Sequence, residues 1–283
     1  MRLWCRSAVA ALAASAAVAQ DQPPPGPPRP PGQLAPGLQM PPDIIPVSPK
    51  AHGRAGVAAE WMAIWDDLWK RRDDPAVLRQ LDALTEEHLA EDPNAFETNR
   101  RHASLVAWEA DGEADGSDEK AAKGKAAWEA GDKAIQASPG DVRGHYYSGV
   151  GVGLYSEGVG ILTALSQGLE GKFRERMLAA LRIDKDFLDG APQVVWGRYF
   201  FKLPWPKRDL DESIRVLRIA VRSHPGNWRA KLYLADSLIV NGLEGQDDEA
   251  HLLVQQILDA PGGHDPPEEK RVKEMARRWK SKH

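Results

Sequence analysis

The sequence predicts an all-α fold built from repeated helical hairpins. Sustained alternation of polar and apolar residues, which is typical of strands, is nearly absent, and no hairpin turn joins two β-branched runs. Helix-capping sequences are frequent instead. Small residues, large residues and prolines also recur with a period close to 34 residues, the length of one helical hairpin repeat.

The N-terminus has the three parts of an export signal. Arg2 and Arg6 give a positive start, residues 7–19 form an apolar run, and Ala17–Ala19 provides an Ala-x-Ala cleavage site. A mitochondrial transit peptide would carry more Arg and Ser. We therefore expect residues 1–19 to be a signal peptide that is cleaved near Ala19, which predicts a periplasmic or secreted protein.

Charge and cysteine content narrow the function classes. The single cysteine, Cys5, lies inside the predicted signal peptide, so the mature chain is expected to fold without disulfides. The formal net charge of −4 gives no support for nucleic-acid binding, which requires a basic face. The apolar run at residues 7–19 is too short to span a bilayer, so no transmembrane segment is expected in the mature chain.

Residues 20–50 are predicted to be a Pro-rich, disordered linker. Twelve of the 22 prolines of the chain lie in this stretch. Such composition favours extended polyproline II and suits a spacer between a tether and a folded domain. A ligand for a proline-reading groove is the alternative. The folded domain is expected to occupy residues 51–283.

Helix starts and stops can be placed within this domain. Asp74 precedes a proline, as a capping residue before the first helical position does. Asp209–Glu212 fits a capping box, and Asp265–Glu268 opens the last helix in the same way. The segments at 138–140 and 224–226 each contain Pro-Gly, which is typical of a helix end followed by a turn.

The period itself resembles that of tetratricopeptide repeats. Their second helix carries a small, a large and a second small residue four and three positions apart, followed by proline. This frame is matched by Ser213, Leu217, Ala220 and Pro225. It recurs at Ala250, Val254, Ile257 and Pro261 with the proline one residue early, and at Phe173, Met177, Ala180 and Lys185 with lysine in place of proline. First helices fit at Gln193, Trp196, Gly197 and Phe200, and at Lys231, Leu234, Ala235 and Leu238. The sequence thus predicts a tetratricopeptide-like solenoid of about five hairpins over residues 55–261, with a capping helix at 266–282.

A narrower resemblance covers roughly residues 140–261. It is carried by an ordered series of short motifs, namely Gly144–Tyr147, the Gly-rich Gly149–Gly160, Ala180–Asp184, Phe187, Asp189–Pro192, Trp196–Phe200, Leu203–Pro206, Leu234–Leu238, Ala250 and Leu258–Pro261. In this order they resemble the T-component family of tripartite ATP-independent periplasmic (TRAP) transporters. Proteins that regulate microtubule dynamics share a similar layout, but the export signal argues against them.

The resemblance implies a periplasmic helical protein that assists a solute-binding subunit. Such a protein would help to hand an organic acid or a hydrophobic ligand to a membrane permease. Members are often lipid-anchored through a cysteine after the apolar run of the signal, whereas Cys5 lies before that run.

Catalytic and metal-binding motifs are missing from the sequence. The eight histidines do not form a metal-ligand spacing, and neither a nucleophile elbow nor a mature cysteine is present. Gly149–Gly153 lacks the lysine and preceding strand of a phosphate loop, so close helix packing is the better interpretation. Residues 146–169 are expected to form a buried helix followed by a long loop. These patterns predict a protein that is not an enzyme and needs no metal or cofactor.

Aromatic residues are the best functional clue. Trp61, Trp65 and Trp69 share one helix face, and a second group surrounds a Pro-rich turn. Core packing explains both groups, while a groove for a peptide or an apolar ligand is the functional alternative. Beside the second group an arginine is placed to hold a carboxylate through its planar fork. The candidate ligand- or partner-binding residues are Trp196, Arg198, Tyr199, Phe200 and Trp205.

The sequence therefore favours an exported, non-enzymatic binding or adaptor protein, similar to a transport T-component. Its expected partners are a solute-binding subunit or another envelope protein, together with a small apolar or carboxylate ligand. The alternative is an envelope scaffold for protein–protein assembly without a small-molecule ligand. An unrecognised hydrolase is the third hypothesis, because a spatial site can escape sequence motifs.

Overall fold

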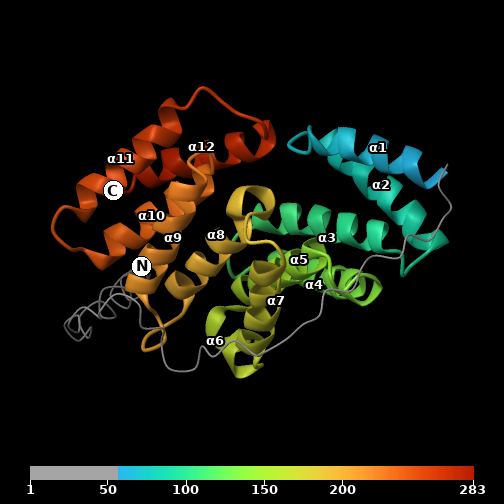
Figure 1. Ribbon diagram of the computed structural model, residues 1–283, viewed down its shortest axis with the longest axis horizontal. Helices are drawn as coiled ribbons and strands as arrows, with labels where there is room; N and C mark the ends of the chain where they lie inside the picture. Colours follow the sequence, from blue (N-terminus) through green and yellow to red (C-terminus); the bar gives the residue numbers. More distant parts are fainter. Residues whose placement is uncertain (1–56) are drawn as a thin grey trace, which may run out of the picture. The chain divides into compact units, whose positions relative to one another are not determined.

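The computed structural model describes residues 57–283, with side chains from residue 60 onward. The predicted signal peptide (1–19) and Pro-rich linker (20–50) lie outside these residues. Within the described part every regular element is a helix (Figure 1), which confirms the all-α prediction there. The helices are α1 (Val57–Trp69), α2 (Pro75–Glu91), α3 (Phe96–Asp111), α4 (Asp118–Ala137), α5 (Val142–Val159), α6 (Ile161–Ser166), α7 (Leu169–Ile183), α8 (Phe187–Lys202), α9 (Leu210–Ser223), α10 (Trp228–Asn241), α11 (Gln246–Asp259) and α12 (Pro266–Lys280).

The helix boundaries follow the capping sequences. The carboxylates of Asp74, Asp209 and Asp265 accept backbone hydrogen bonds at the starts of α2, α9 and α12, at 2.7, 2.9 and 3.4 Å. These contacts satisfy N–H groups that have no partner within the helix. The helices α4 and α9 end at Ala137 and Ser223, directly before the predicted Pro-Gly turns. The capping predictions are thus confirmed at all five boundaries.

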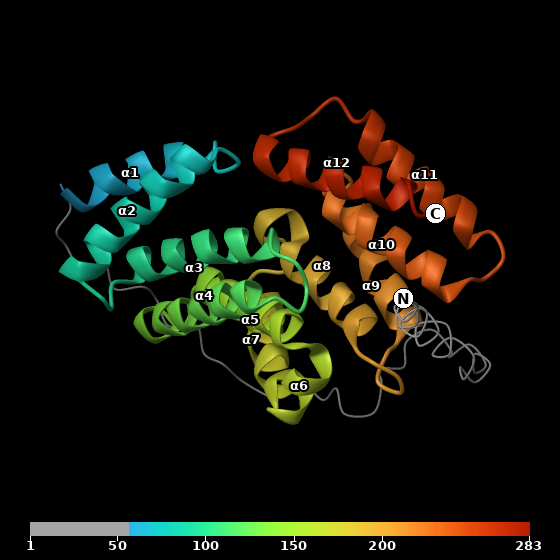
Figure 2. The ribbon, with the colours of Figure 1, turned by 180° about the vertical axis from the view of Figure 1, so that it is seen from behind.

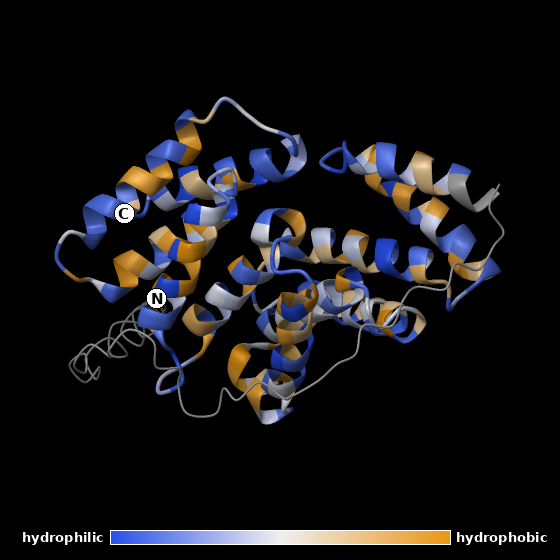
Figure 3. Ribbon diagram, viewed as in Figure 1, coloured by the Kyte–Doolittle hydropathy of each residue, from blue (hydrophilic) through white to orange (hydrophobic). Residues whose placement is uncertain are grey.

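Helices pack mainly against their neighbours along the chain. The successive pairs α1·α2, α3·α4, α8·α9 and α10·α11 are in contact, and contacts also join α3 to α5, α8 to α10 and α10 to α12. Hydrophobic and hydrophilic residues alternate along the helices (Figure 3), as is typical of amphipathic helices that bury one face. Among the described helices, none combines the length and the apolar character needed to cross a membrane.

The residues of the predicted register lie in the core. In α9, Ser213, Leu217 and Ala220 are fully buried. The register positions 234, 235 and 238 of α10 and 250, 254 and 257 of α11 are buried as well, whereas Lys231 of α10 is half-buried. Ser213 Oγ donates a hydrogen bond to the Gly197 carbonyl oxygen at 2.9 Å, across the α8·α9 contact. A β-carbon at Gly197 would lie 2.6 Å from Leu217 Cγ. The small residues therefore allow two helices to approach closely.

The segment between α5 and α7 differs from the expected long loop. It contains the short helix α6, which is flanked by two glycines with positive φ, Gly160 at 87° and Gly168 at 72°. Glycine adopts such angles without steric cost, so the chain can leave one helix and enter the next within a few residues. The expectation of an unstructured loop was wrong for residues 161–166, because glycine at both ends permits a separate helical turn.

The closest helix contact joins α4 to α5, which lie side by side in Figures 1 and 2. Glycines on both helices face this contact, namely Gly144, Gly151 and Gly158 of α5 and Gly124 and Gly131 of α4. A β-carbon at Gly151 would lie 2.3 Å from the backbone nitrogen of Trp128, and one at Gly158 would lie 2.4 Å from that of Ala121. The prediction that Gly149–Gly153 serves close helix packing is confirmed here by Gly151.

We predict that Gly151→Ala destabilises the protein by roughly 1–3 kcal/mol, because the added methyl group must displace backbone atoms. Chemical denaturation followed by circular dichroism measures the effect. Gly171→Ala is the matched control. Gly171 is exposed in α7 with open space around its α-carbon, so the higher helix propensity of alanine should stabilise that helix. Equal stability of the two variants would contradict the interpretation of the α4·α5 contact.

Candidate functional site

A cavity of about 400 Å³ lies between the N-terminal and C-terminal helices of the described region. The helices α3, α5, α7, α8, α10 and α12 all contribute to its wall. Most of the lining is apolar, with aromatic rings from Trp108, Tyr146, Tyr147, Phe173, Tyr199 and Tyr233. An apolar cavity of this size with a few polar groups is the usual form of a small-molecule site.

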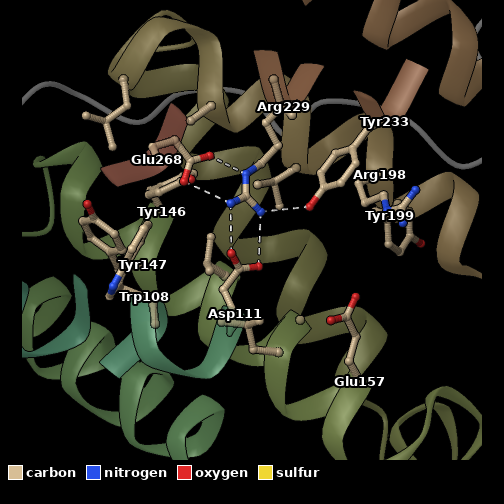
Figure 4. Close-up of a pocket in the computed structure, with 18 of the residues that line it drawn as sticks. Trp108, Asp111, Tyr146, Tyr147, Glu157, Arg198, Tyr199, Arg229, Tyr233 and Glu268 are labelled. Atoms are coloured by element: carbon tan, nitrogen blue, oxygen red, sulfur yellow. Dashed lines mark hydrogen bonds and ion pairs between the residues drawn. The ribbon is translucent and has the colours of Figure 1, made fainter. Parts of the chain in front are cut away.

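Arg229 in α10 forms the central polar cluster of this cavity (Figure 4). Its Nε and Nη2 donate to Glu268 at 2.6 and 3.0 Å, and its Nη1 and Nη2 donate to Asp111 at 3.2 and 2.9 Å. Nη1 also donates to the Tyr233 hydroxyl at 3.1 Å. A guanidinium has five N–H groups, and all five are used. Arg229 therefore joins α3, α10 and α12 and keeps no donor for a ligand.

Asp111 ends α3 and is shared by two arginines. Besides Arg229 it accepts a hydrogen bond from Arg271 Nη1 of α12 at 3.0 Å. Burial alone would raise the pKa of Asp111, but the charges and hydrogen bonds of Arg229 and Arg271 outweigh it and lower this pKa to about 2. The carboxylate is therefore ionised in the folded protein at any pH above that value.

Cations and indole rings alternate along one wall of the cavity. The Arg72 guanidinium lies 4.5 Å from the ring centroid of Trp69 and 4.3 Å from that of Trp108, and Arg271 covers Trp108 at 3.2 Å. Arg72 Nη2 also donates to Asp265 at 2.7 Å. Cation–π contacts of this kind are strengthened when water is excluded. They fix the indole rings in place as a rigid apolar wall.

The predicted site residues separate into two groups. Arg198 and Tyr199 line the cavity. The Arg198 guanidinium lies between the rings of Phe201 and Tyr233, 4.3 Å from each, and its Nη1 donates to Asp236 at 2.6 Å. The fork proposed to hold a carboxylate thus already has a carboxylate partner within the chain.

Trp196, Phe200 and Trp205 lie apart from the cavity lining. Trp196 and Phe200 are buried behind it, with their ring centroids 5.2 Å apart, and Trp196 also stacks on Tyr199 at 5.1 Å. Trp205 in the α8–α9 connection is 68% exposed. The structure therefore brings Trp196, Tyr199 and Phe200 together, but not Trp205.

The first tryptophan group belongs mainly to the helix packing of α1 and α2. Trp65 is buried, and its Nε1 donates to Thr85 Oγ1 at 3.0 Å. Trp65 and Trp69 stack with centroids 4.9 Å apart, and Trp61 stacks on His88 at 4.3 Å. Only Trp69 of this group reaches the cavity.

Two adjacent tyrosines on α5 supply uncharged, unpaired polar groups to the cavity. Tyr146 and Tyr147 lie edge to face at 5.0 Å, and neither hydroxyl forms a hydrogen bond with any residue that the structure describes. Burial raises the pKa of Tyr147 to about 12 and also raises that of Tyr146. Both phenols are therefore protonated at neutral pH and can donate hydrogen bonds.

A left-handed turn forms another part of the cavity wall. Leu188, Asp189 and Gly190 have φ values of 47°, 55° and 78°, and the first two residues line the cavity. Non-glycine residues adopt this conformation at a cost of about 1–2 kcal/mol each, so neighbouring contacts must hold it. Asn227 Nδ2 donates to the Asp189 carbonyl oxygen at 2.9 Å, and His264 Nε2 lies 2.7 Å from the Asp189 carboxylate.

The residues that define this cavity were not among the site residues predicted from the sequence; they are Asp111, Tyr146, Tyr147, Arg229 and Glu268. The Tyr146–Tyr147 pair lay in a motif that carried the family resemblance, and Glu268 lay in the capping sequence of the last helix, but neither motif indicated a site. Asp111, Arg229 and Glu268 come from distant helices. Within the described residues, no group of three or more His, Cys, Asp or Glu side chains is placed to hold a metal ion.

Comparison with known proteins gives no assignment. No protein-family model matches the chain, and no curated protein matches its sequence.

We predict that Asp111→Asn destabilises the protein by about 2–3 kcal/mol, because it leaves Arg229 and Arg271, which are 18% and 21% exposed, short of negative charge. Urea denaturation at neutral pH measures the effect. Asp67→Asn is the control, since Asp67 is 66% exposed in its pair with Lys70 and should change stability by less than about 1 kcal/mol. A loss as small as that of the control would contradict a central role for the Arg229 cluster.

Acid should weaken the folded protein through the same carboxylate. The folded pKa of Asp111, about 2, lies below its ordinary value of 3.8. Its contribution is thus complete above pH 3.8 and is lost as the pH falls towards 2. We expect wild-type stability to fall more steeply over this interval than that of Asp111→Asn, by on the order of 2 kcal/mol. Parallel curves in acid denaturation would contradict this prediction.

Proposed function

We propose that this chain is an exported, non-enzymatic binding protein that holds a small, largely apolar ligand in the cavity around the Arg229 cluster. The observation that carries the proposal is the cavity itself. It combines about 400 Å³ of volume and a mainly apolar, aromatic wall with polar groups that are mostly paired to one another. Such a lining retains a ligand by excluding water from apolar surface.

The pairing of the charged groups in the cavity lining favours ligand binding over catalysis as the function. Within the described cavity lining, Asp111, Glu268 and Arg229 are held by one another, and Glu170 is held by Tyr199 and Lys207. A general base or nucleophile must be free to meet its substrate within hydrogen-bond reach. These groups are committed to the fold, so they suit a stable wall better than an acid–base pair.

We also propose that the helices form a tetratricopeptide-like solenoid and that the protein acts as an accessory T-component of a TRAP-type transporter in the periplasm. Contacts between successive helices and the burial of the predicted register support the repeat assignment. The T-component role is supported by the ordered motifs from Gly144 to Pro261 and by the cavity, which suits a ligand in transit to a permease. A solute-binding subunit is then the expected partner.

One observation favours the alternative role of an envelope scaffold. Trp205 is 68% exposed and Leu162 of α6 is 73% exposed, and tryptophan is among the residue types enriched at the energetic centres of protein interfaces. In this role the two side chains would contact a protein partner, and the cavity would need no ligand.

Fluorescence titration of the full chain with N-phenyl-1-naphthylamine tests ligand binding. We expect saturable binding with a micromolar Kd, and we expect Val195→Trp to weaken it at least tenfold. Val195 is half-buried and lines the cavity, so an indole ring at this position takes up ligand space. Leu162→Trp adds the same ring at an exposed position outside the cavity lining and should leave Kd unchanged. Absence of binding, or an equal Kd for both variants, would exclude the cavity as the site.

A crosslinking pull-down from the native envelope, read by mass spectrometry, tests the partner. Recovery of a solute-binding subunit or permease is the expected result. The scaffold role would instead be established if the wild type recovered assembly or cell-wall proteins without a transporter and if Trp205→Ala no longer recovered them.

A further inference from the structure

The cations of the cavity are neutralised within the protein. Among the described lining residues the cations are Arg72, Arg198, Lys202, Arg229 and Arg271. Each of them forms an ion pair with a carboxylate, with N–O distances between 2.6 and 3.0 Å. Seven carboxylates line the same cavity, so its charged groups do not present a positive field to an anion. An anionic ligand would have to displace one of these carboxylates.

The carboxylates are engaged as well, which disfavours a cationic ligand. Asp111 and Glu268 are bound by arginine, Glu157 is bound by Lys202 and Lys120, and Glu269 accepts backbone hydrogen bonds at the start of α12. Breaking a buried ion pair by occupying one partner leaves the other charge uncompensated. The lining therefore penalises an anion, and it penalises a cation wherever a carboxylate already holds an arginine or lysine. Asp189, which contacts His264, and Glu269, which accepts backbone N–H groups, hold no such cation among the described residues.

The uncharged polar groups left to a ligand are phenol hydroxyls; the buried Arg72 Nε also has no partner, but it belongs to a guanidinium that already holds Asp265. The hydroxyls of Tyr146 and Tyr147 have no partner among the described residues, and both residues line the cavity. The Tyr233 hydroxyl accepts from Arg229 Nη1, which leaves its own hydrogen free to donate. Trp108, Tyr146 and Tyr147 lie on one side of the Arg229 cluster and Arg198, Tyr199 and Tyr233 on the other (Figure 4). A ligand between these walls meets aromatic faces and hydrogen-bond donors.

We infer that the cavity selects an uncharged ligand with an apolar body and a hydrogen-bond-accepting oxygen, such as an ester or a ketone. Tyr146 and Tyr147 donate to that oxygen, and the aromatic walls bury the rest. This inference rests on the proposed binding function and narrows it. Of the two ligand classes expected from the sequence, it selects the apolar one and excludes the carboxylate.

A free acid and its ester should differ in their free energy of binding to this cavity. Both bury the same alkyl chain, so the hydrophobic contribution nearly cancels. The carboxylate must also lose its hydration without gaining a free cation, which is costly in a buried site. The ester keeps acceptor oxygens that the tyrosines can satisfy, and a buried donor without a partner is itself unfavourable.

Competition against bound N-phenyl-1-naphthylamine tests the inference on the full chain. The competitors are methyl decanoate, decanoate and decylamine at neutral pH, which carry no charge, a negative charge and a positive charge. We expect the ester to displace the probe at concentrations at least tenfold lower than the two ions. Tighter binding of the acid or the amine would overturn the inference, while binding of the probe itself would still support the proposed function.

Tyrosine variants separate hydrogen bonding from simple hydrophobicity. Tyr146→Phe and Tyr147→Phe should each weaken methyl decanoate binding about fivefold and leave the Kd of the naphthylamine probe, which lacks an oxygen, unchanged. Tyr155→Phe on the same helix is the control, because Tyr155 packs beside Trp128 and does not line the cavity. Unchanged ester binding in both cavity variants would overturn the assignment of these hydroxyls.

Discussion

The ion-pair cluster of Arg229, Asp111 and Glu268 is the interaction on which the cavity depends. Arg229 reaches Asp111, which is 118 positions earlier in the chain, and Glu268, which is 39 positions later. Together with the Arg72–Asp265 and Arg271–Asp111 pairs, this cluster joins helices that are distant in the chain across the cavity. A fully paired buried cluster is costly to break on one side only. The wall of the cavity is consequently fixed before a ligand arrives, and binding need not order it.

A second constraint comes from the glycines at the contact between α4 and α5, which have no side chain. The glycines between α4 and α5 let the two backbones approach to distances that a β-carbon would prevent. This contact fixes the rotation of α5 about its axis. Because Tyr146 and Tyr147 lie on the same helix, the rotation also decides that they line the cavity. The α4·α5 contact therefore determines both the packing of α5 and the position of the Tyr146 and Tyr147 hydroxyls.

Most side chains around the cavity are thus committed to the fold. The arginines hold carboxylates and cover indole rings, and the strained turn at Leu188–Gly190 is held by Asn227 and His264. The uncharged groups that remain available are tyrosine hydroxyls and aromatic faces. A wall of this kind discriminates by charge and shape rather than by a strong ion pair, because each charged group already has a partner of its own.

The sequence by itself determined the helical class of the described region, the helix boundaries and much of the core. Capping residues such as Asp74 and small residues such as Ser213 act on neighbours within one hairpin, so local spacing contains the necessary information. It also singled out Arg198 and Tyr199, which line the cavity. Only the tertiary structure decided that Asp111, Arg229 and Glu268 meet and that Trp205 stays exposed. Those outcomes depend on how successive helices turn relative to one another, and small rotations summed over many helices are not encoded in any local pattern.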